Sequence, residues 1–307
     1  MRVIQDNAAR QLASASVVTV GNFDGMHLGH QALIRRCLAG AEPGQVTAVV
    51  TFEPLPQAFF RPGQAPARLS SPAQKLELIE KSGIDLVWLM RFNQALAEMP
   101  AADFARSVLA EGLGARRVVV GSDFRFGRTR QGDLGLLTEL GQDLGFAVES
   151  VEDVEVNGRK VSSTLVRELL ASGDLEAAAR CLGRPFSMRG QVVTGQQLGR
   201  KLGYPTANLR LEAAPSPLSG VFAVRARIGG QGPWRPAVAS LGVRPAVGGS
   251  EFLVEVHFFD FDADLYQREL EVRFIARIRD EENFPGMEEL VEQMKNDEQR
   301  VREILNV

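Results

Sequence analysis

The first half of the chain alternates short apolar runs with segments of helical periodicity. The runs with the length of buried β-strands are residues 16–20, 46–52, 85–90 and 117–121, and residues 146–156 are also predicted to be extended. The segments with apolar residues at helical spacing are residues 28–38, 72–82, 101–110, 133–144, 163–171 and 174–182. Strands of nearly continuous apolar composition that alternate with helices predict a parallel sheet in an α/β domain.

The pattern changes after about residue 184. Strand-like runs follow one another at residues 191–193, 221–228, 237–241, 252–259 and 270–278. Glycine and proline clusters separate them, and the next helical segment is residues 287–305. This predicts an all-β unit, a small barrel or sandwich, with one C-terminal helix. We therefore expect two domains, residues 1–183 and residues 184–307.

Composition agrees with two globular domains and narrows the class of partner. The 307 residues are 45% hydrophobic and 24% charged, with a net charge of -3. This balance disfavours a broad basic face for nucleic acid. No apolar run approaches the ~20 residues that span a bilayer, and no signal peptide is recognisable at the start, so we expect a cytoplasmic protein without a membrane partner.

Cysteine and arginine usage add two smaller points. Cys37 and Cys181 are far apart and form no CxxC pair, which disfavours a disulfide framework and a cysteine zinc site and fits a reducing compartment. Of the 35 basic residues only five are lysine, and the other 30 are arginine. Arginine suits bidentate phosphate binding, but a composition bias of the source genome is the favoured explanation.

The string GNFDGMHLGH at residues 21–30 lies between the first predicted strand and helix. Gly21 and Gly25 let the backbone approach a ligand, and the helix start favours an anion. The spacing is neither GxGxxG nor GxxxxGK[ST]. His27 and His30 are suited to donate hydrogen bonds to phosphate oxygens during nucleotidyl transfer. A structural role is the alternative, and metal binding is disfavoured because no third ligand stands nearby.

The HxGH part of this string resembles the signature of the nucleotidylyltransferase superfamily. The full string and six others, in order, resemble the bacterial bifunctional riboflavin kinases/FMN adenylyltransferases. The six are TFEP at 51–54, GSDFRFGRTRQGD at 121–133, VSSTLVR at 161–167, GRPF at 183–186, LGRKLGYPTANL at 198–209 and EVHFFDFDADLY at 255–266. The resemblance implies a Rossmann-like α/β nucleotidylyltransferase domain with a parallel sheet, followed by an all-β flavokinase barrel with a C-terminal helix.

The resemblance also implies the chemistry. The second domain would phosphorylate riboflavin to FMN with ATP and Mg²⁺, and the first would adenylylate FMN with ATP to give FAD and pyrophosphate. Riboflavin, FMN, FAD and ATP are then the partners, and the oligomeric state stays open.

For the first domain, the resemblance implies catalysis by His27 and His30. It assigns ATP or phosphate contacts to Gly21, Phe23, Asp24, Gly29, Ser163, Thr164 and Arg167, and flavin contacts to Asp123, Phe124 and Phe126. The alternatives are helix capping in residues 162–164 and aromatic side chains anchored in the core. The chain departs from the family at Leu55, where histidine is common, and at Leu165, where arginine is common.

For the second domain, the resemblance implies that Thr206 and Asn208 contact Mg²⁺ and ATP phosphate, since hydroxyl and amide oxygens suit this ion. Glu255 is the implied general base for the riboflavin hydroxyl. The implied ATP-side residues are Gly195, Gly199 and Lys201, and Arg279 is the implied flavin contact. A simple turn, a solvated strand glutamate and a surface arginine are the alternatives.

Two other functions compete with this interpretation. One is a flavin-sensing regulator, which the joint presence of Thr206, Asn208 and Glu255 disfavours. The other is a monofunctional riboflavin kinase with an impaired adenylyltransferase half, for which Leu55 and Leu165 are the indications. The products formed from riboflavin and ATP would separate these alternatives.

Overall fold

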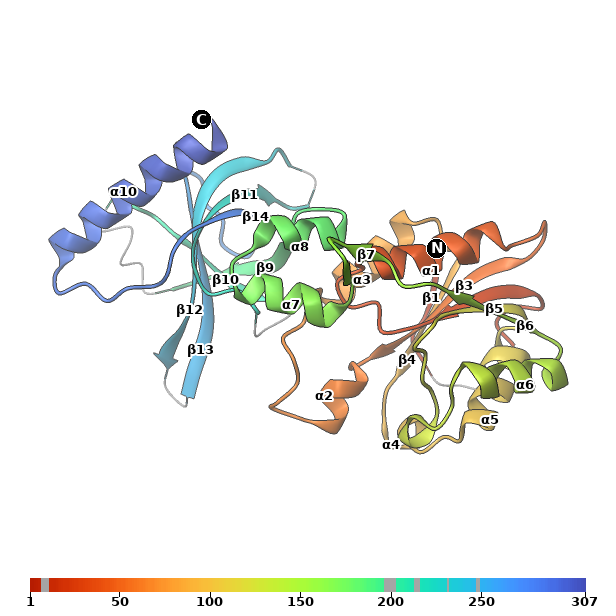
Figure 1. Cartoon of the computed structure of the whole chain (residues 1–307). Coiled ribbons are helices and arrows are strands. Elements are labelled where there is room, and N and C mark those ends of the chain that lie inside the picture. Colours follow the sequence, from red (N-terminus) through yellow and green to blue (C-terminus); the bar gives the residue numbers. More distant parts are fainter. Residues whose placement is uncertain (7–10, 196–202, 213–215, 231, 247–248) are drawn as a thin grey trace. The chain divides into compact units, whose positions relative to one another are not determined.

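A sheet of six parallel strands organises the first unit of the protein (Figure 1). Its strands are β1 (Arg2–Ile4), β2 (Ser16–Val20), β3 (Val46–Glu53), β4 (Leu86–Arg91), β5 (Ala115–Gly121) and β6 (Ala147–Val151). Their spatial order is β1-β4-β3-β2-β5-β6. The chain therefore runs from β2 toward one edge and returns to β5 on the other side of β2. Ligands of open α/β sheets bind at the carboxyl ends of the strands at such a reversal.

The computed structural model describes residues 1–6, 11–195, 203–212, 216–230, 232–246 and 249–307. Its contacts group Met1–Pro66 with Pro72–Val161 as the first unit, and Ala67–Ser71 with Ser162–Val307 as the second. The predicted division after residue 183 differs from this grouping because two helices, α7 (Ser163–Ala171) and α8 (Leu175–Leu182), fall in the second unit. The division into catalytic domains at that point stays a prediction.

Helices cover both faces of the parallel sheet, because each central strand is apolar on both sides. Val17 of β2 and Val49 of β3 pack with Ile34 of α1 (Leu28–Ala39) and Ile79 of α3 (Pro72–Lys81). The opposite face packs against a π-helix, η1 (Ala105–Gly112), and α6 (Leu134–Leu144). The remaining short elements are α2 (Pro56–Phe60), α4 (Gln94–Ala97), α5 (Ala101–Phe104), η2 (Arg128–Arg130) and the hairpin strands β7 (Glu155–Val156) and β8 (Arg159–Lys160).

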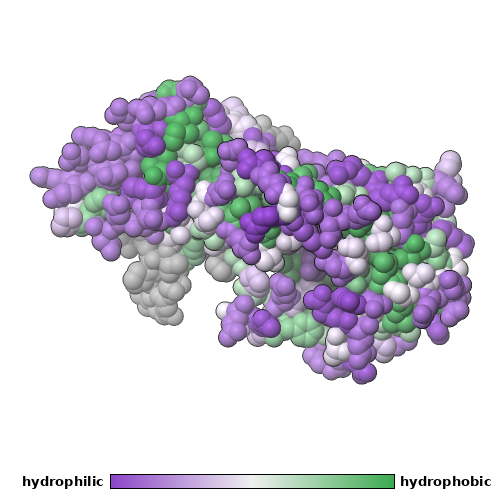
Figure 2. Space-filling model, in the orientation of Figure 1, coloured by the Kyte–Doolittle hydropathy of each residue, from purple (hydrophilic) through white to green (hydrophobic). Residues whose placement is uncertain are grey.

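The second unit is a closed antiparallel barrel with the strand order β10-β13-β12-β11-β14-β9. The strands are β9 (Ser187–Val193), β10 (Ala207–Leu211), β11 (Gly220–Ile228), β12 (Arg235–Ala246), β13 (Gly249–Phe258) and β14 (Glu269–Arg279). The C-terminal helix α10 (Met287–Leu305) packs Val301 and Leu305 against Ala223 and Phe259. Most of its other side chains are partly or fully exposed, and its visible surface is hydrophilic (Figure 2).

The predicted fold class is confirmed in both units. The main difference lies at β10, because no strand was predicted between residues 193 and 221. Ala207 and Leu209 are instead buried strand residues, and β10 closes the barrel between β9 and β13. The short edge strand β1 was not predicted either, since three residues carry too little pattern to identify.

Candidate active sites

The string at residues 21–30 forms the turn between β2 and α1, at the reversal point of the sheet. His27 is the N-cap of α1, and its Nδ1 accepts a hydrogen bond of 3.4 Å from the backbone N–H of His30. The imidazole rings of His27 and His30 stack with their centroids 3.7 Å apart. A side chain on Gly29 would press against the His27 ring, with a Cβ only 3.2 Å from its Nδ1. The glycine thus permits the stack.

His30 is partly buried, and its Nδ1 has no hydrogen-bond partner among the residues that the structure describes. Burial lowers the pKa of His30 well below its usual 6.5, and the neighbouring His27 and Lys75 lower it further. His30 is therefore neutral at pH 7. A neutral imidazole still presents one N–H donor, so His30 can donate a hydrogen bond to a phosphate oxygen.

Two of the other predicted phosphate contacts in this turn, Phe23 and Asp24, are buried. Asp24 is buried, with 2% of its surface exposed. Phe23 is completely buried in the core, where its ring lies 5.1 Å from that of His30. The Phe23 side chain therefore supports the turn from behind, and a contact between this residue and ATP would involve its backbone. Gly21 gives room to the same ring.

The three predicted flavin residues lie between β5 and α6. Asp123 and Phe124 reach the surface, whereas Phe126 is buried. Asp123 is exposed and accepts a 2.8 Å hydrogen bond from Lys160, which holds the pKa of Asp123 below its usual range. Phe126 is buried and stacks on the partly buried Phe124, with centroids 5.4 Å apart. The alternative of a core-anchoring aromatic therefore describes Phe126, while Phe124 still reaches the surface.

The start of α7 is capped by Ser162, whose Oγ accepts a 3.1 Å hydrogen bond from the Leu165 N–H. The predicted phosphate contacts Ser163 and Thr164 are thus the first two helical residues. Arg167 donates from Nε to the Ala67 carbonyl at 2.6 Å, within the second unit. Leu165 is buried, so the residue that departs from the family pattern fills core space.

The segment around Leu55 carries an aromatic cluster that the sequence did not suggest. Leu55 occupies the N-cap position of α2. Its side chain is buried and makes no hydrogen bond to the helix. The rings of Phe59, Phe60 and Phe92 lie edge to face, with centroids 5.4 to 5.6 Å apart. Phe60 is 61% exposed, which is unusual for a phenylalanine and presents a ring face or edge to a ligand.

In the barrel, the pairing of strands brings the predicted kinase residues together. Asn208 on β10 is the cross-strand neighbour of Glu255 on β13, and Glu255 in turn pairs with Ser240 on β12. Directly paired residues project to the same face, with Cβ atoms about 4.5–5.5 Å apart. Val254 and Val256 point the other way and are fully buried, so Asn208 and Glu255 face away from the barrel interior.

Neighbouring residues hold this segment in place. His257 contacts the carbonyl oxygen of Pro205 through Nδ1 at 2.9 Å, just before Thr206. A Cβ on Gly195 would overlap the side-chain amide of Asn208, so only glycine leaves room there. Gly199 and Lys201 lie outside the described residues, and their predicted roles stay predictions.

One acidic residue beside this site was not predicted. Ser240 donates a 3.1 Å hydrogen bond from Oγ to Glu281, in the segment that follows β14. The Glu281 carboxylate also occupies the space where Gly242 lacks a side chain. Three sequence-distant positions, Asn208, Glu255 and Glu281, thus lie around Ser240, a juxtaposition that only the barrel register reveals.

Arg279 was predicted to be a flavin contact or a surface arginine, and the structure pairs it with a buried carboxylate. Its Nε lies 3.1 Å from both carboxylate oxygens of Asp297 on α10, and its Nη2 lies 2.8 Å from one of them. Asp297 is buried and also accepts a hydrogen bond from Gln293. Arg279 thus fastens α10 to the end of β14, whatever else it contacts.

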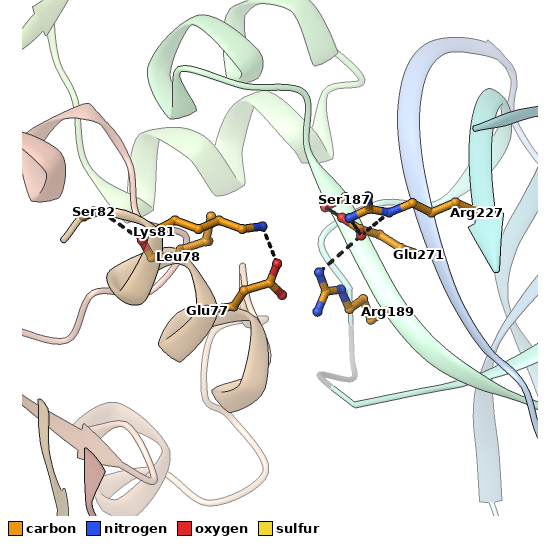
Figure 3. A network of polar contacts seen from close by, with 8 residues as sticks. All are labelled: Glu77, Leu78, Lys81, Ser82, Ser187, Arg189, Arg227 and Glu271. Atoms are coloured by element: carbon orange, nitrogen blue, oxygen red, sulfur yellow. Dashed lines mark hydrogen bonds and ion pairs between the residues drawn. The ribbon is translucent and has the colours of Figure 1, made fainter. Parts of the chain in front are cut away.

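Other arginines gather around Glu271 on β14 (Figure 3). Its cross-strand neighbours are Arg189 on β9 and Arg227 on β11, and both donate to its buried carboxylate, as does Ser187. Burial lowers the pKa of nearby Arg184 to about 10, and Glu271 opposes that shift. Part of the arginine excess therefore satisfies one buried carboxylate.

Two further observations concern metals and membranes. Among the described residues, no group of three or more histidine, cysteine or acidic side chains has the geometry of a metal site. Within the same residues, no helix combines the length and the apolar composition needed to cross a bilayer.

Comparison with known proteins gives a consistent result over the whole chain. A sequence profile described as FAD synthetase matches residues 9–165, and one described as riboflavin kinase matches residues 182–305. A bifunctional riboflavin kinase/FMN adenylyltransferase of Pseudomonas fluorescens is 46% identical over 276 residues, covering 89% of this chain and 88% of its own. The protein of that name from Escherichia coli K12 is 38% identical over 302 residues, covering 98% and 96%.

A solved structure is similar over the same length. The crystal structure of a protein described as a macrolide-efflux protein from Streptococcus pneumoniae superposes with a TM-score of 0.85 at 32% sequence identity. The match covers 98% of this chain and 99% of that one. The similarity therefore extends through both units.

Proposed function

The chain belongs to the family of bifunctional riboflavin kinases/FMN adenylyltransferases, and from that premise we propose how its residues carry the two reactions. It is a transferase of FAD biosynthesis that makes FMN from riboflavin and FAD from FMN. The observation that carries the assignment of residues is the pairing of Asn208 with Glu255 across β10 and β13. The stacking of His27 on His30 is the corresponding observation for the adenylyltransferase site.

Adenylylation is assigned to the turn between β2 and α1. A phosphate oxygen of FMN attacks the α-phosphorus of ATP, the bond to the β-phosphate breaks, and pyrophosphate leaves. The Nδ1 atom of His27 accepts a hydrogen bond, so its neutral ring carries the proton on Nε2 and can donate it to a phosphate oxygen. His30 donates as a neutral imidazole beside it. Both donors stabilise the charge that builds up in the transition state.

A phosphate-binding role is also proposed for the start of α7, as the family resemblance implies. Ser163, Thr164 and Arg167 lie in the first turns of a helix whose cap is already satisfied by Ser162. The positive end of the helix dipole at that point favours an anion. Arg167 would add a positive charge for a phosphate group bound there.

Riboflavin phosphorylation is assigned to the outer face of the barrel. Glu255 takes the proton of the riboflavin 5′-hydroxyl as this oxygen attacks the γ-phosphorus of ATP, and ADP leaves. Asn208 is held beside Glu255 by the strand register, and Gly195 leaves room for its amide. These groups contribute to catalysis mainly by positioning the substrates, because phosphoryl transfer requires little covalent chemistry from the protein.

The donor set in the barrel fits Mg²⁺. Thr206 offers a hydroxyl and Asn208 an amide oxygen, so these two residues supply only hard oxygen ligands. Mg²⁺ prefers such ligands and keeps waters and nucleotide phosphates for its other positions. When bound with ATP, the ion would neutralise charge on the phosphates. Thr206 and Asn208 are the residues that would hold it.

Flavin contacts are proposed at two places in the first unit. Asp123 and Phe124 are accessible in the segment between β5 and α6. The exposed ring of Phe60, backed by Phe59 and Phe92, offers an aromatic surface for the flavin ring system. We also propose a cytoplasmic location, which agrees with two buried free cysteines.

Product analysis tests the assignment. The protein is incubated with riboflavin, ATP and Mg²⁺, or with FMN, ATP and Mg²⁺, and riboflavin, FMN and FAD are separated by chromatography. FAD in both reactions is the expected result. FMN from riboflavin without FAD would mean that the first unit is inactive, and no conversion at all would refute both sites. The same reactions without Mg²⁺ test the metal requirement.

A further inference from the structure

Lys75, on α3, is a completely buried lysine to which the sequence pattern assigns no function. Its ammonium lies 3.1 Å from the carbonyl oxygen of Phe52, 3.3 Å from Thr51 Oγ1 and 3.4 Å from the carbonyl oxygen of Asn22. The carboxylate of Glu53 is 3.7 Å away. Burying an ammonium is costly unless it is paired and hydrogen-bonded, so these contacts are what make the position tolerable.

The contacts join two adjacent strand ends. Asn22 belongs to the turn that follows β2, while Thr51 and Phe52 belong to the end of β3, the parallel neighbour of β2. Thr51 Oγ1 also donates to the Asn22 carbonyl at 3.1 Å. Lys75 therefore anchors the turn from α3, on the side where the sheet binds its ligand.

The turn needs such anchoring because its backbone is strained. Phe23 has a φ of 50° and Met26 a φ of 45°, in the left-handed region that side chains other than glycine rarely adopt. Residues of this kind persist only where the surroundings fix them, and they concentrate at functional sites. Asn22, the residue that Lys75 contacts, directly precedes the first of them.

We propose that Lys75 is a positioning residue for FMN adenylylation, whose ammonium ties the Asn22 carbonyl to the Phe52 carbonyl and so fixes the turn that presents His27 and His30 to ATP. The proposal rests on the adenylyltransferase function assigned above. It adds a residue on α3 that touches neither nucleotide nor flavin and acts through the turn.

The charge of Lys75 has a second effect on the same site. Two titratable groups act on His30, namely His27 from its own turn and Lys75 from α3, while Glu53 faces the ammonium from the end of β3. Removing the cation removes one of the causes that lower the pKa of His30. The pKa then rises, so protonation of His30 begins at a higher pH.

Lys75→Met is the first test, because methionine is unbranched and keeps most of the length of the lysine side chain without its ammonium. The rate of FAD formation from FMN and ATP is measured at saturating substrate over a range of pH. We expect kcat to fall about 100-fold, the scale of loss from a small misplacement of catalytic groups, while the KM for ATP changes less. The acid limb of the pH profile should move to higher pH.

Matched variants separate positioning from general stability. Lys81→Met alters the other lysine of α3, which is exposed and pairs with Glu77 (Figure 3), and should leave kcat near wild type. Lys75→Arg keeps the charge and should recover much of the rate without moving the acid limb. Riboflavin kinase activity, measured on the same samples, should be unchanged in all three variants, and thermal unfolding reports whether each is folded.

Several outcomes would overturn the proposal. A wild-type kcat in Lys75→Met is one. Another is a loss of activity that merely follows the fraction of unfolded protein, with the acid limb of the pH profile unchanged. If Lys75→Met does not fold, Thr51→Val removes the hydroxyl that bridges Lys75 and Asn22, and kcat should fall several-fold, as for one lost hydrogen bond. An unchanged rate there would also refute the proposal. A wild-type chain that makes no FAD from FMN would instead refute the adenylyltransferase assignment itself.

Discussion

Asp297→Asn should loosen the C-terminal helix from the barrel. The Asp297 carboxylate is 5% exposed and receives the Arg279 guanidinium through Nε at 3.1 Å and Nη2 at 2.8 Å. Asparagine has the same shape but no charge, so the guanidinium loses its counter-ion. Breaking one partner of a buried pair costs about 3–5 kcal/mol. Since 17% of the Arg279 side chain still reaches solvent, we expect the lower end, about 3 kcal/mol.

The assay uses the two activities of the same chain. Samples are heated to a series of temperatures, and the remaining riboflavin kinase activity is measured with FMN adenylyltransferase activity as the internal reference. A loss of about 3 kcal/mol should lower the midpoint of kinase inactivation by roughly 6–12 °C. Asp262→Asn, at an exposed aspartate, is the control and should not move it. A midpoint within about 2 °C of wild type would refute the reasoning.

The same pair decides what Arg279 does. If it mainly fastens α10, Arg279→Gln and Asp297→Asn should be strongly non-additive, with a coupling of about 0.5–3 kcal/mol in the double variant. If it also contacts flavin, Arg279→Gln should raise the KM for riboflavin well below the inactivation temperature, and Asp297→Asn should not. Additive stability effects would contradict the fastening role.

Glu255, Gly195 and the buried Cys37 give the remaining predictions. Glu255→Gln should lower the riboflavin kinase rate by about 10²–10⁴-fold, as for loss of a general base, and leave FMN adenylylation unchanged; a kinase rate close to wild type would exclude this role. Gly195→Ala should displace the Asn208 amide and raise the Mg²⁺ concentration needed for half-maximal kinase activity, and an unchanged Mg²⁺ titration would contradict this. Burial raises the pKa of the Cys37 thiol to about 12, so a thiol reagent at pH 8 should label it only after denaturation, and labelling of the folded protein would be the opposite result. Its contribution to stability is complete below its ordinary pKa of 9.0 and should be lost as the pH rises toward 12, which denaturant titrations at pH 8 and 10.5 would detect.

The order of strands and helices was largely readable from the sequence because burial on both faces leaves a strong apolar signal. Strands β2 and β3 are largely apolar, and the structure buries all of β2 and the middle of β3. Strand β10 was not identified, since the polar Asn208 and Arg210 alternate with apolar residues over only five positions. A short strand of that kind is indistinguishable from a polar turn until a partner strand fixes its register.

The candidate sites were predictable as motifs but not as arrangements. The string at residues 21–30 located His27 and His30, yet the stacking of their rings and the capping of α1 by His27 are evident only from the structure. Phe126 shows the opposite case. Its motif left a flavin contact and a core-anchoring role both open, and the ring is buried against Phe104 and Phe124. A motif records which residues recur together and does not separate a side chain that touches substrate from one that supports the segment.

The buried charges are the features that sequence patterns describe least well, and one of them carried a usable signal. Lys75 stands four residues before Ile79 on α3, so both project to the same face of the helix, and both are completely buried. A lysine on an apolar helix stripe is costly without partners, and that conflict alone indicates a specific contact. Glu271 gave no comparable signal, because it lies among arginines on an alternating strand and reads as a solvated position. Its burial follows from the pairing of β14 with β9 and β11, which brings Arg189 and Arg227 to its two sides. A buried charge is therefore predictable from the sequence where it interrupts an apolar stripe. Where it fits the polar alternation of a strand, its burial can be inferred only once the strand register is known.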